Sequence, residues 1–231
     1  MKTEHHCASV RLILMCAAVA LCVAPVSYGE LERVGPIMPE NGYPAWYQDT
    51  TGLTLEFGAP LNQAELDGGW CLLLPADVPS GTAPETFPTD FAEEHFYWSC
   101  EADVEVTENG QDVRLRLVMA LEATFGLEAI APGDQVVFGR MRIRIIDCPY
   151  DGTYNVYTPY GNWEFNNQEA GEKLTFTADI GIGAPGTFDG ALTSHIGPFL
   201  LPSNTPGGAE LPPVTGPVPG KLYIADPDRE G

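Results

Sequence analysis

Hydrophobic and polar residues alternate through residues 101–118 on both sides of the dipeptide Asn109-Gly110. An Asn-Gly pair between two alternating runs is the strongest short-range signal for a β-hairpin, because a type I′ turn requires a positive φ at both central residues. The cross-strand pairs predicted outward from the turn are Val106–Val113, Glu105–Arg114, Val104–Leu115 and Asp103–Arg116. One face of this hairpin is apolar and the other is a ladder of opposite charges. Since a slip of one residue would bury the charges, we expect a well-defined register.

A second alternating run covers residues 135–146 and places three arginines on one face, namely Arg140, Arg142 and Arg144. Rows of like charge on neighbouring strands repel each other. We therefore expect the acidic strand at 101–107 to separate the two strands that carry arginines. The predicted strand order is 113–118, 101–107, 137–146. Exposed ion pairs contribute only about 0–1 kcal/mol each, so they select neighbours more than they stabilise the fold.

Further short alternating runs, separated by turns rich in proline and glycine, continue along the chain. The clearest lie at residues 53–57, 153–157 and 173–177, and the continuous apolar run at 70–74 is expected to be a short buried strand. Residues 119–125 contain good helix formers, and we interpret them as a short helix rather than a continued strand. The pattern predicts an all-β fold, an antiparallel β-sandwich that is immunoglobulin-like or jelly-roll-like, with long Pro/Gly-rich loops and little helix. Residues 151–156, DGTYNV, are similar to the corner and strand late in immunoglobulin-like domains.

The N-terminus has the features of a signal peptide over residues 1–29. Lys2 and Arg11 precede an apolar run that is too short to cross a bilayer comfortably, and small residues before Glu30 suggest cleavage there. A retained membrane anchor is the alternative. We expect a β-sandwich domain at 30–201, a Pro/Gly-rich linker at 202–220 and the start of a truncated further segment at 221–231. The chain is thus predicted to be secreted or on the cell surface, without membrane insertion after signal removal.

The formal net charge of −21 narrows the classes of partner. Such a charge repels phosphate and disfavours binding to nucleic acid or to an anionic membrane. A well-solvated exterior is the ordinary explanation, and binding of a divalent cation is the more specific one. Calcium takes oxygen ligands from carboxylates and loop carbonyls. Asp147, Asp151 and Asp189 lie in predicted turns and are the candidate ligands of a structural calcium ion, although no EF-hand pattern is present.

Three of the six cysteines lie in the predicted signal peptide, which leaves Cys71, Cys100 and Cys148. An exported chain with three cysteines can form one disulfide. Cys100 begins the acidic strand and Cys148 follows another strand, so both could lie at the same edge of a sheet. We predict a Cys100–Cys148 disulfide, and the state of Cys71 stays open.

Four aromatic residues in predicted loops and short strands are candidates for ligand binding: Trp46, Tyr47, Tyr160 and Trp163. Together they would form a platform on which sugar rings stack, or they would close the ends of the sandwich, which we favour. His95 and His195 are the histidines outside the predicted signal peptide, and no nucleophile motif such as G-x-S-x-G accompanies them. We therefore assign no catalytic residue.

Several segments spread over the chain share one resemblance. They are VGP at 34–36, NGYPAWYQD at 41–49, GDQVVF at 133–138, RIR at 142–144, GTY at 152–154, PYG at 159–161, DIGI at 179–182 and IGPFL at 196–200. Together they resemble the N-terminal region of a group of uncharacterised secreted bacterial proteins with an immunoglobulin-like β-rich domain. The resemblance implies no known activity. It implies a longer protein with further extracellular domains, and a cysteine where this chain has Gly58, paired with one near Cys71.

These observations favour a secreted, non-catalytic β-sandwich domain with a structural or interaction role in an extracellular bacterial protein. The partner would be a protein or a glycan, and we expect no cofactor apart from the structural calcium ion. The alternative is a carbohydrate-binding module or a fragment of a secreted hydrolase. Exposed, coplanar aromatic rings would favour sugar binding, whereas a cleft that joins a histidine to two carboxylates would favour an enzyme.

Overall fold

The computed structural model describes residues 31–108, 110–127, 129–158 and 160–202, together with 11–12, 214–215, 220 and 222–224. Apart from residues 11–12, the predicted signal peptide lies outside the described residues, as do its cleavage site before Glu30 and most of the predicted linker. Three short strands form a small antiparallel sheet in the order β11-β13-β12: β11 (Leu201–Pro202), β13 (Leu222–Ile224) and β12 (Val214–Thr215).

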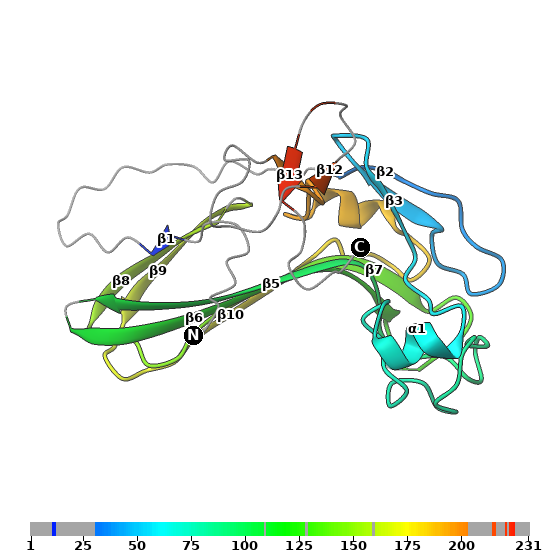
Figure 1. Ribbon diagram of the computed structural model, residues 1–231, viewed down its shortest axis with the longest axis horizontal. Coiled ribbons are helices and arrows are strands. Elements are labelled where there is room, and N and C mark those ends of the chain that lie inside the picture. The colour runs from blue at the N-terminus through cyan, green and yellow to red at the C-terminus, as the bar shows by residue number, and fades with distance from the viewer. Residues whose placement is uncertain are drawn as a thin grey trace.

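The largest sheet has four antiparallel strands in the order β10-β7-β6-β5 (Figure 1). Their bounds are His95–Glu108 for β5, Gln111–Phe125 for β6, Gln135–Ile145 for β7 and Leu174–Ile180 for β10. β5 and β6 form the predicted hairpin, and its register is confirmed. The observed pairs include Val106–Val113, Glu105–Arg114, Val104–Leu115 and Asp103–Arg116. Gly110 has a φ of 80°, as this turn requires.

The predicted strand order is wrong, because β6 rather than the acidic strand β5 lies in the middle. The arginine-bearing strands β6 and β7 are therefore neighbours, and Arg116 lies opposite Arg144. β5 supplies Glu101 to Arg116 on one side, β10 supplies Asp179 to Arg140 on the other, and Glu122 of β6 also lies against Arg140. Consecutive strands joined by short turns tend to become neighbours. Exposed ion pairs are too weak to impose a different order.

Residues 119–125 continue β6 and do not form the predicted helix. This half of β6 lies inside the sheet, and residues 119–123 are all buried. Leu121 and Ala123 face the core, whereas Ala120 and Glu122 lie on the opposite face. Because both faces are covered here, the alternation that identifies a strand is lost. Packing of this kind outweighs intrinsic helix propensity.

Two smaller sheets cover one face of the main sheet near its opposite ends (Figure 1). The first contains β1 (Arg11–Leu12), β8 (Gly152–Thr158) and β9 (Gly161–Gln168). The second contains β2 (Leu31–Val34), β3 (Trp46–Asp49) and β4 (Thr54–Glu56), and the 3₁₀ helix η1 (Asp189–Thr193) packs beside β2. The protein is therefore an all-β antiparallel sandwich, as predicted.

Tyr154, near the start of β8, forms a corner typical of immunoglobulin-like sandwiches. Its hydroxyl donates to the carbonyl of Tyr150 at 2.8 Å and accepts from the amide of the same residue at 3.2 Å. The side chain of Tyr154 is fully buried. A buried tyrosine that bonds to the backbone a few residues upstream defines the tyrosine corner of that fold class. The similarity of residues 151–156 to such a corner is thus reflected in the hydrogen bonds.

The α-helix α1 (Gln63–Gly68) introduces a segment that differs from the prediction. Asn62 caps the helix by accepting the amide of Glu65, and Gly69 ends it with a φ of 67°. Residues 70–74 form turns rather than a buried strand. Of this run only Leu73 is buried, in a small separate core that also contains Leu66, Val78 and Ala92. The apolar side chains around it face solvent.

Candidate functional site

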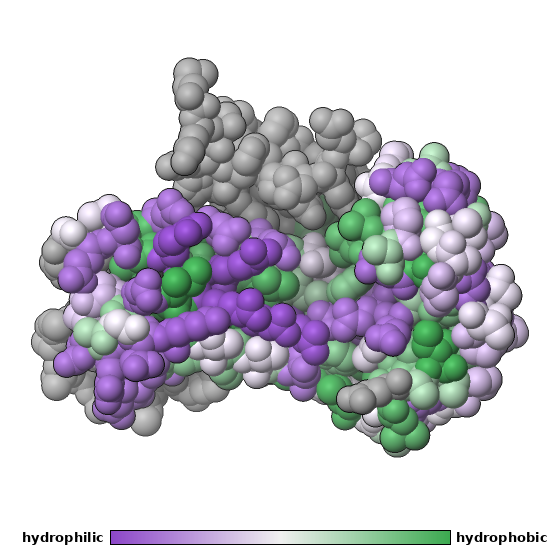
Figure 2. Space-filling model, turned by 90° about the horizontal axis from the view of Figure 1, so that it is seen from below, coloured by the Kyte–Doolittle hydropathy of each residue, from purple (hydrophilic) through white to green (hydrophobic). Residues whose placement is uncertain are grey.

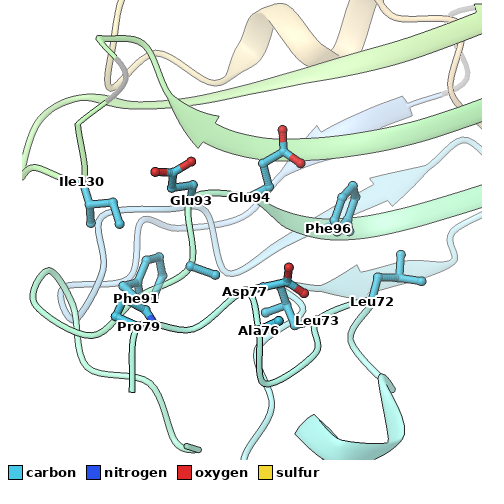
Figure 3. Close-up of a pocket in the computed structure, with 11 residues that line it drawn as sticks. Leu72, Leu73, Ala76, Asp77, Pro79, Phe91, Glu93, Glu94, Phe96 and Ile130 are labelled. Carbon is cyan, nitrogen blue, oxygen red and sulfur yellow. The ribbon is translucent and has the colours of Figure 1, made fainter. Parts of the chain in front are cut away.

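A cleft of about 580 Å³ opens where β5 begins (Figure 3). It is lined by residues from 91–96, which lead into β5, from 72–79, which follow α1, and by Ile130 from the connection between β6 and β7. The prolines at 75 and 79 prevent a regular element in the segment after α1. Asp77 fixes a turn there, because its carboxylate accepts the amide of Leu74 at 2.8 Å.

The cleft combines an apolar lining with a rim of carboxylates. Its apolar lining residues are Leu72, Leu73, Ala76, Pro79, Phe91, Ala92, Phe96 and Ile130. Its carboxylates are Asp77, Glu93 and Glu94, and Figure 3 shows Glu93 and Glu94 across the cleft from Asp77. An apolar concave surface with a few polar groups is the usual form of a binding site.

The charged residues that line the cleft are all acidic. No lysine or arginine lines it, and no ion pair of the described residues involves Asp77, Glu93 or Glu94. Residues 34–113, which provide the whole lining except Ile130, contain fifteen Asp or Glu and no Lys or Arg. A cleft with charges of one sign and low-dielectric walls concentrates the electric field. This cleft therefore attracts cations and repels anions.

Large apolar side chains extend from the cleft onto the surface near α1. Leu61 is 76% exposed, Trp70 70%, Leu74 51% and Leu72 45%. Seen from below, apolar groups gather at the end of the molecule that carries α1, whereas a hydrophilic row follows the main sheet (Figure 2). Leu72 has a φ of 63°, a conformation that is uncommon for residues other than glycine. Exposed apolar surface of this kind often marks an interaction site.

His95 and Glu85 form a buried pair within an aromatic cluster. The side chain of His95 is fully buried and that of Glu85 is 3% exposed, with His95 Nε2 2.9 Å from Glu85 Oε2. Glu85 Oε1 accepts the amide of Ala92 at 2.7 Å. The imidazole ring lies 4.3 Å from the ring of Phe91 and 4.7 Å from that of Phe57. Neither member of the pair lines the cleft.

The four aromatic residues predicted to bind a ligand do not form an exposed platform. Tyr47 is fully buried, donates to the carbonyl of Phe188 at 3.0 Å, and has a pKa that burial and the charge of Asp189 raise far above its ordinary value. Tyr160 is buried edge-to-face against Trp98. Trp46 and Trp163 are half-buried. The burial of Tyr47 and Tyr160 supports the interpretation that we favoured, in which these side chains pack within the sandwich, over an exposed sugar-binding platform.

The predicted calcium ligands are not brought together. Asp147 and Asp151 lie between β7 and β8, where Asp151 accepts the amide of Ala170 at 2.8 Å. Asp189 begins η1, close enough to Tyr47 to affect its pKa. In the ranges that the structure describes, no group of three or more His, Cys, Asp or Glu side chains could hold a metal ion. The sequence indicated that these aspartates lie in turns, but it did not indicate that Asp189 lies in a different part of the fold from Asp147 and Asp151.

The predicted disulfide between Cys100 and Cys148 is also wrong. Cys100 lies opposite Met119, which lies opposite Met141, whereas Cys148 lies beyond the end of β7 at Ile145. At about 3.3 Å per residue, the two cysteines are roughly 20 Å apart along the strands, far beyond the reach of a disulfide. Cys148 is instead a buried thiol near Tyr154, and burial raises its pKa.

A cluster of charges on the main sheet borders the cleft. Arg140 donates through Nε and Nη2 to the two carboxylate oxygens of Asp179, at 2.8 and 2.9 Å. Its Nη1 lies 2.8 Å from Glu122 Oε2, without the alignment of a hydrogen bond. Burial raises the pKa of Glu122 to about 7, which Arg140 opposes and Glu94 of the cleft reinforces. Phe96 of the cleft lies opposite Glu122 across β5 and β6.

The cleft was not predicted from the sequence, because its walls come from segments that are brought together only by the fold. Residues 70–74 were expected to be buried, and Glu93 and Glu94 were not assigned any role. One signal was available. The long stretch at 34–113 without a single lysine or arginine could have indicated a strongly acidic surface.

The fold and the site define an antiparallel β-sandwich with an acidic cleft over an apolar floor. Comparisons of the chain with protein-family models, curated proteins and solved structures found no match. Among the described residues, no helix has the length and apolar character needed to cross a membrane.

Proposed function

We propose that this chain is a secreted, non-catalytic β-sandwich domain that acts by binding a partner through the cleft beside β5. The observation that carries the proposal is the cleft itself, about 580 Å³ in volume, with an apolar floor and a rim of carboxylates. The exposed side chains of Leu72 and Leu74 extend its apolar surface. Concave apolar surface surrounded by polar groups is typical of binding sites.

The position of the histidines supports a non-catalytic role. General acid–base catalysis requires a titratable group within hydrogen-bonding reach of the substrate. Neither His95 nor His195 lines the cleft. His95 is enclosed with Glu85, and His195 is half-buried with its ring 6.1 Å from that of Trp163, edge to face. The cleft thus offers no histidine as a catalytic base, and the substrate assay below tests whether its carboxylates act as catalytic groups.

The geometry around Gly58 supports the proposed relationship to secreted bacterial proteins that carry a cysteine at this position. A Cβ atom placed on Gly58 would lie 3.6 Å from the Cβ of Cys71, which is within the range for a disulfide. The same atom would lie 2.4 Å from the carbonyl oxygen of Phe96. A relative with that disulfide would therefore need a small shift of the backbone here.

A photo-crosslinking experiment tests the binding function. A photoreactive amino acid is placed at Ala76, which is exposed and lines the cleft, and at Asn162, which is exposed on β9. The full chain is produced in the organism that encodes it and is irradiated. We expect a discrete crosslinked product from position 76 and none from position 162. Mass spectrometry identifies the crosslinked partner.

The same preparation is assayed against chromogenic glycoside, ester and peptide substrates, and we expect no hydrolysis above that of the buffer. Hydrolysis that is lost when Glu93 and Glu94 are both changed to Gln would contradict the non-catalytic role. Equal crosslinking from both positions, or none from either, would contradict binding through the cleft.

A further inference from the structure

We infer that the occupant of the cleft is a polypeptide segment of a partner protein in which basic side chains flank apolar ones. This inference rests on the proposed binding function and specifies the chemistry of the partner. The basic side chains would contact Asp77, Glu93 and Glu94, and the apolar ones would contact the accessible side chains of Leu72 and Phe96.

The charge of the cleft selects a cationic partner. Its three carboxylates form no ion pair with any residue that the structure describes. The surrounding chain from 34 to 113 supplies no basic residue that could neutralise them. The partly buried cluster of Glu122, Arg140 and Asp179 next to the cleft contains two carboxylates and one guanidinium. Complementary charge of this kind accelerates association and excludes acidic partners.

The apolar surface selects a polypeptide rather than a small cation. A metal ion or a simple amine would leave the accessible apolar side chains of Leu72, Phe96 and Ile130 uncovered. The apolar surface also continues outside the cleft through Leu72, Leu74 and Trp70, so a suitable ligand must extend beyond it. A second copy of this chain is disfavoured, because each copy carries a net charge of −21.

A peptide-binding assay on the full chain tests the inference. The probe is a short fluorescent peptide of alternating lysine and leucine. One matched peptide replaces lysine with glutamate, another replaces lysine with serine, and a third replaces leucine with serine. Fluorescence anisotropy should show binding of the lysine–leucine peptide that weakens as salt is added, because exposed charges are screened. The three other peptides should bind much more weakly.

Matched variants locate the binding site. Glu93→Gln with Glu94→Gln should weaken binding of the lysine–leucine peptide about fivefold to tenfold. The control pair, Glu169→Gln with Glu172→Gln, removes the same charge from exposed positions between β9 and β10 and should have no effect. Leu72→Ala should also weaken binding, whereas Ile146→Ala should not, although the two side chains are 45% and 47% exposed. Circular dichroism confirms that each variant is folded.

Equal weakening by the two double variants would show that only the overall charge attracts the peptide, and would overturn the inference. Equal binding of the lysine–serine peptide would overturn it too, because the apolar floor would then have no role. If the serine–leucine peptide binds as well as the lysine–leucine peptide and Leu72→Ala weakens both, the cleft is a binding site but its partner is not cationic. Absence of binding by every peptide overturns the inference, and the crosslinking experiment decides the proposed function independently.

Discussion

At the scale of single residues, the buried carboxylate of Glu85 is held by specific partners. The carboxylate of Glu85 contacts both His95 and the amide of Ala92, and aromatic rings surround the imidazole. Burial of a polar group costs free energy unless hydrogen bonds replace those it made with water. A histidine in such surroundings stabilises the fold, and solvent cannot reach it.

The pair of His95 and Glu85 leads to a prediction about stability. His95→Phe fills the aromatic cluster but leaves the buried carboxylate without one of its two partners. We expect the free energy of unfolding to fall by about 3 kcal/mol, because breaking a buried pair leaves an uncompensated charge. Adding Glu85→Gln should recover most of the loss, since a neutral carbonyl can still accept the amide of Ala92. Urea unfolding followed by tryptophan fluorescence measures the free energy of unfolding of the single and the double variant. Unchanged stability of His95→Phe would disprove the role assigned to the pair.

Glu122 leads to a prediction about pH. Its pKa is raised from an ordinary value of 4.5 to about 7 in the folded protein, mainly by burial. Between these values the folded state retains a proton that the unfolded state releases, so stability must fall as pH rises through this interval. We expect Glu122 to lower the free energy of unfolding by up to about 3 kcal/mol between roughly pH 4.5 and pH 7.

Glu122→Gln is the control for this prediction, because glutamine has a similar shape and does not titrate. The difference in unfolding free energy between the two proteins should change over that interval and stay constant above it. Urea unfolding at several pH values provides the measurement. Parallel pH profiles for the wild type and the variant would contradict the prediction.

At the scale of elements, the main sheet has one feature that the local sequence predicts, the hairpin of β5 and β6. It has another that depends on long-range packing, the position of β7. The hairpin of β5 and β6 has the register that its turn and alternation predicted. The position of β7 was not predictable from charge, because Arg116 lies opposite Asp103 and forms an ion pair with Glu101 on one side, and lies opposite Arg144 on the other. The Nε of Arg144 is buried and has no hydrogen-bond partner among the described residues.

This arrangement predicts that two similar substitutions in β6 have different effects. Arg114→Glu places like charges opposite each other at Glu105 and should cost about 1 kcal/mol of stability. Arg116→Glu likewise places like charges opposite each other at Asp103 and loses the ion pair with Glu101, but it gains an opposite charge across from Arg144, so its net cost should be smaller than that of Arg114→Glu. Thermal unfolding of both variants side by side provides the measurement. Equal destabilisation by the two would mean that Arg144 does not interact with position 116.

At the scale of the whole molecule, the basic residues are distributed unevenly. The basic residues of the described ranges are Arg11 in β1, Arg33, the arginines of β6 and β7, and Lys173, whereas residues 34–113, which supply most of the cleft lining, contain none. Such an uneven distribution attracts a cationic partner to one end of the protein. Three carboxylates beside an apolar floor would then orient a bound segment.

The proposed export predicts the residue at which the mature chain begins. When the full-length chain is expressed in a secreting bacterial host, the protein outside the cytoplasm should begin at Glu30, because small residues precede that position. Mass spectrometry of the secreted and the membrane fractions measures the cleavage. Recovery of the intact chain from Met1 in the membrane fraction would instead support a retained anchor.

The sequence by itself determined the features that depend on neighbouring residues. The alternation around Asn109-Gly110 defined a hairpin and its register, and repeated short runs defined an all-β sandwich. Signals of this kind are local, since each residue's environment in a strand is set by its parity and by the nearest turn.

Only the tertiary structure decided which strands became neighbours, which aromatic residues were buried and where a cleft formed. Residues 119–125 became a strand because packing covers both of their faces, and residues 70–74 became exposed turns because only Leu73 found a core. The cleft joins residues 72–79, 91–96 and Ile130, which no local pattern connects. The physical reason is that burial and proximity between distant segments depend on the whole packed chain, whereas alternation and turn chemistry act over a few residues.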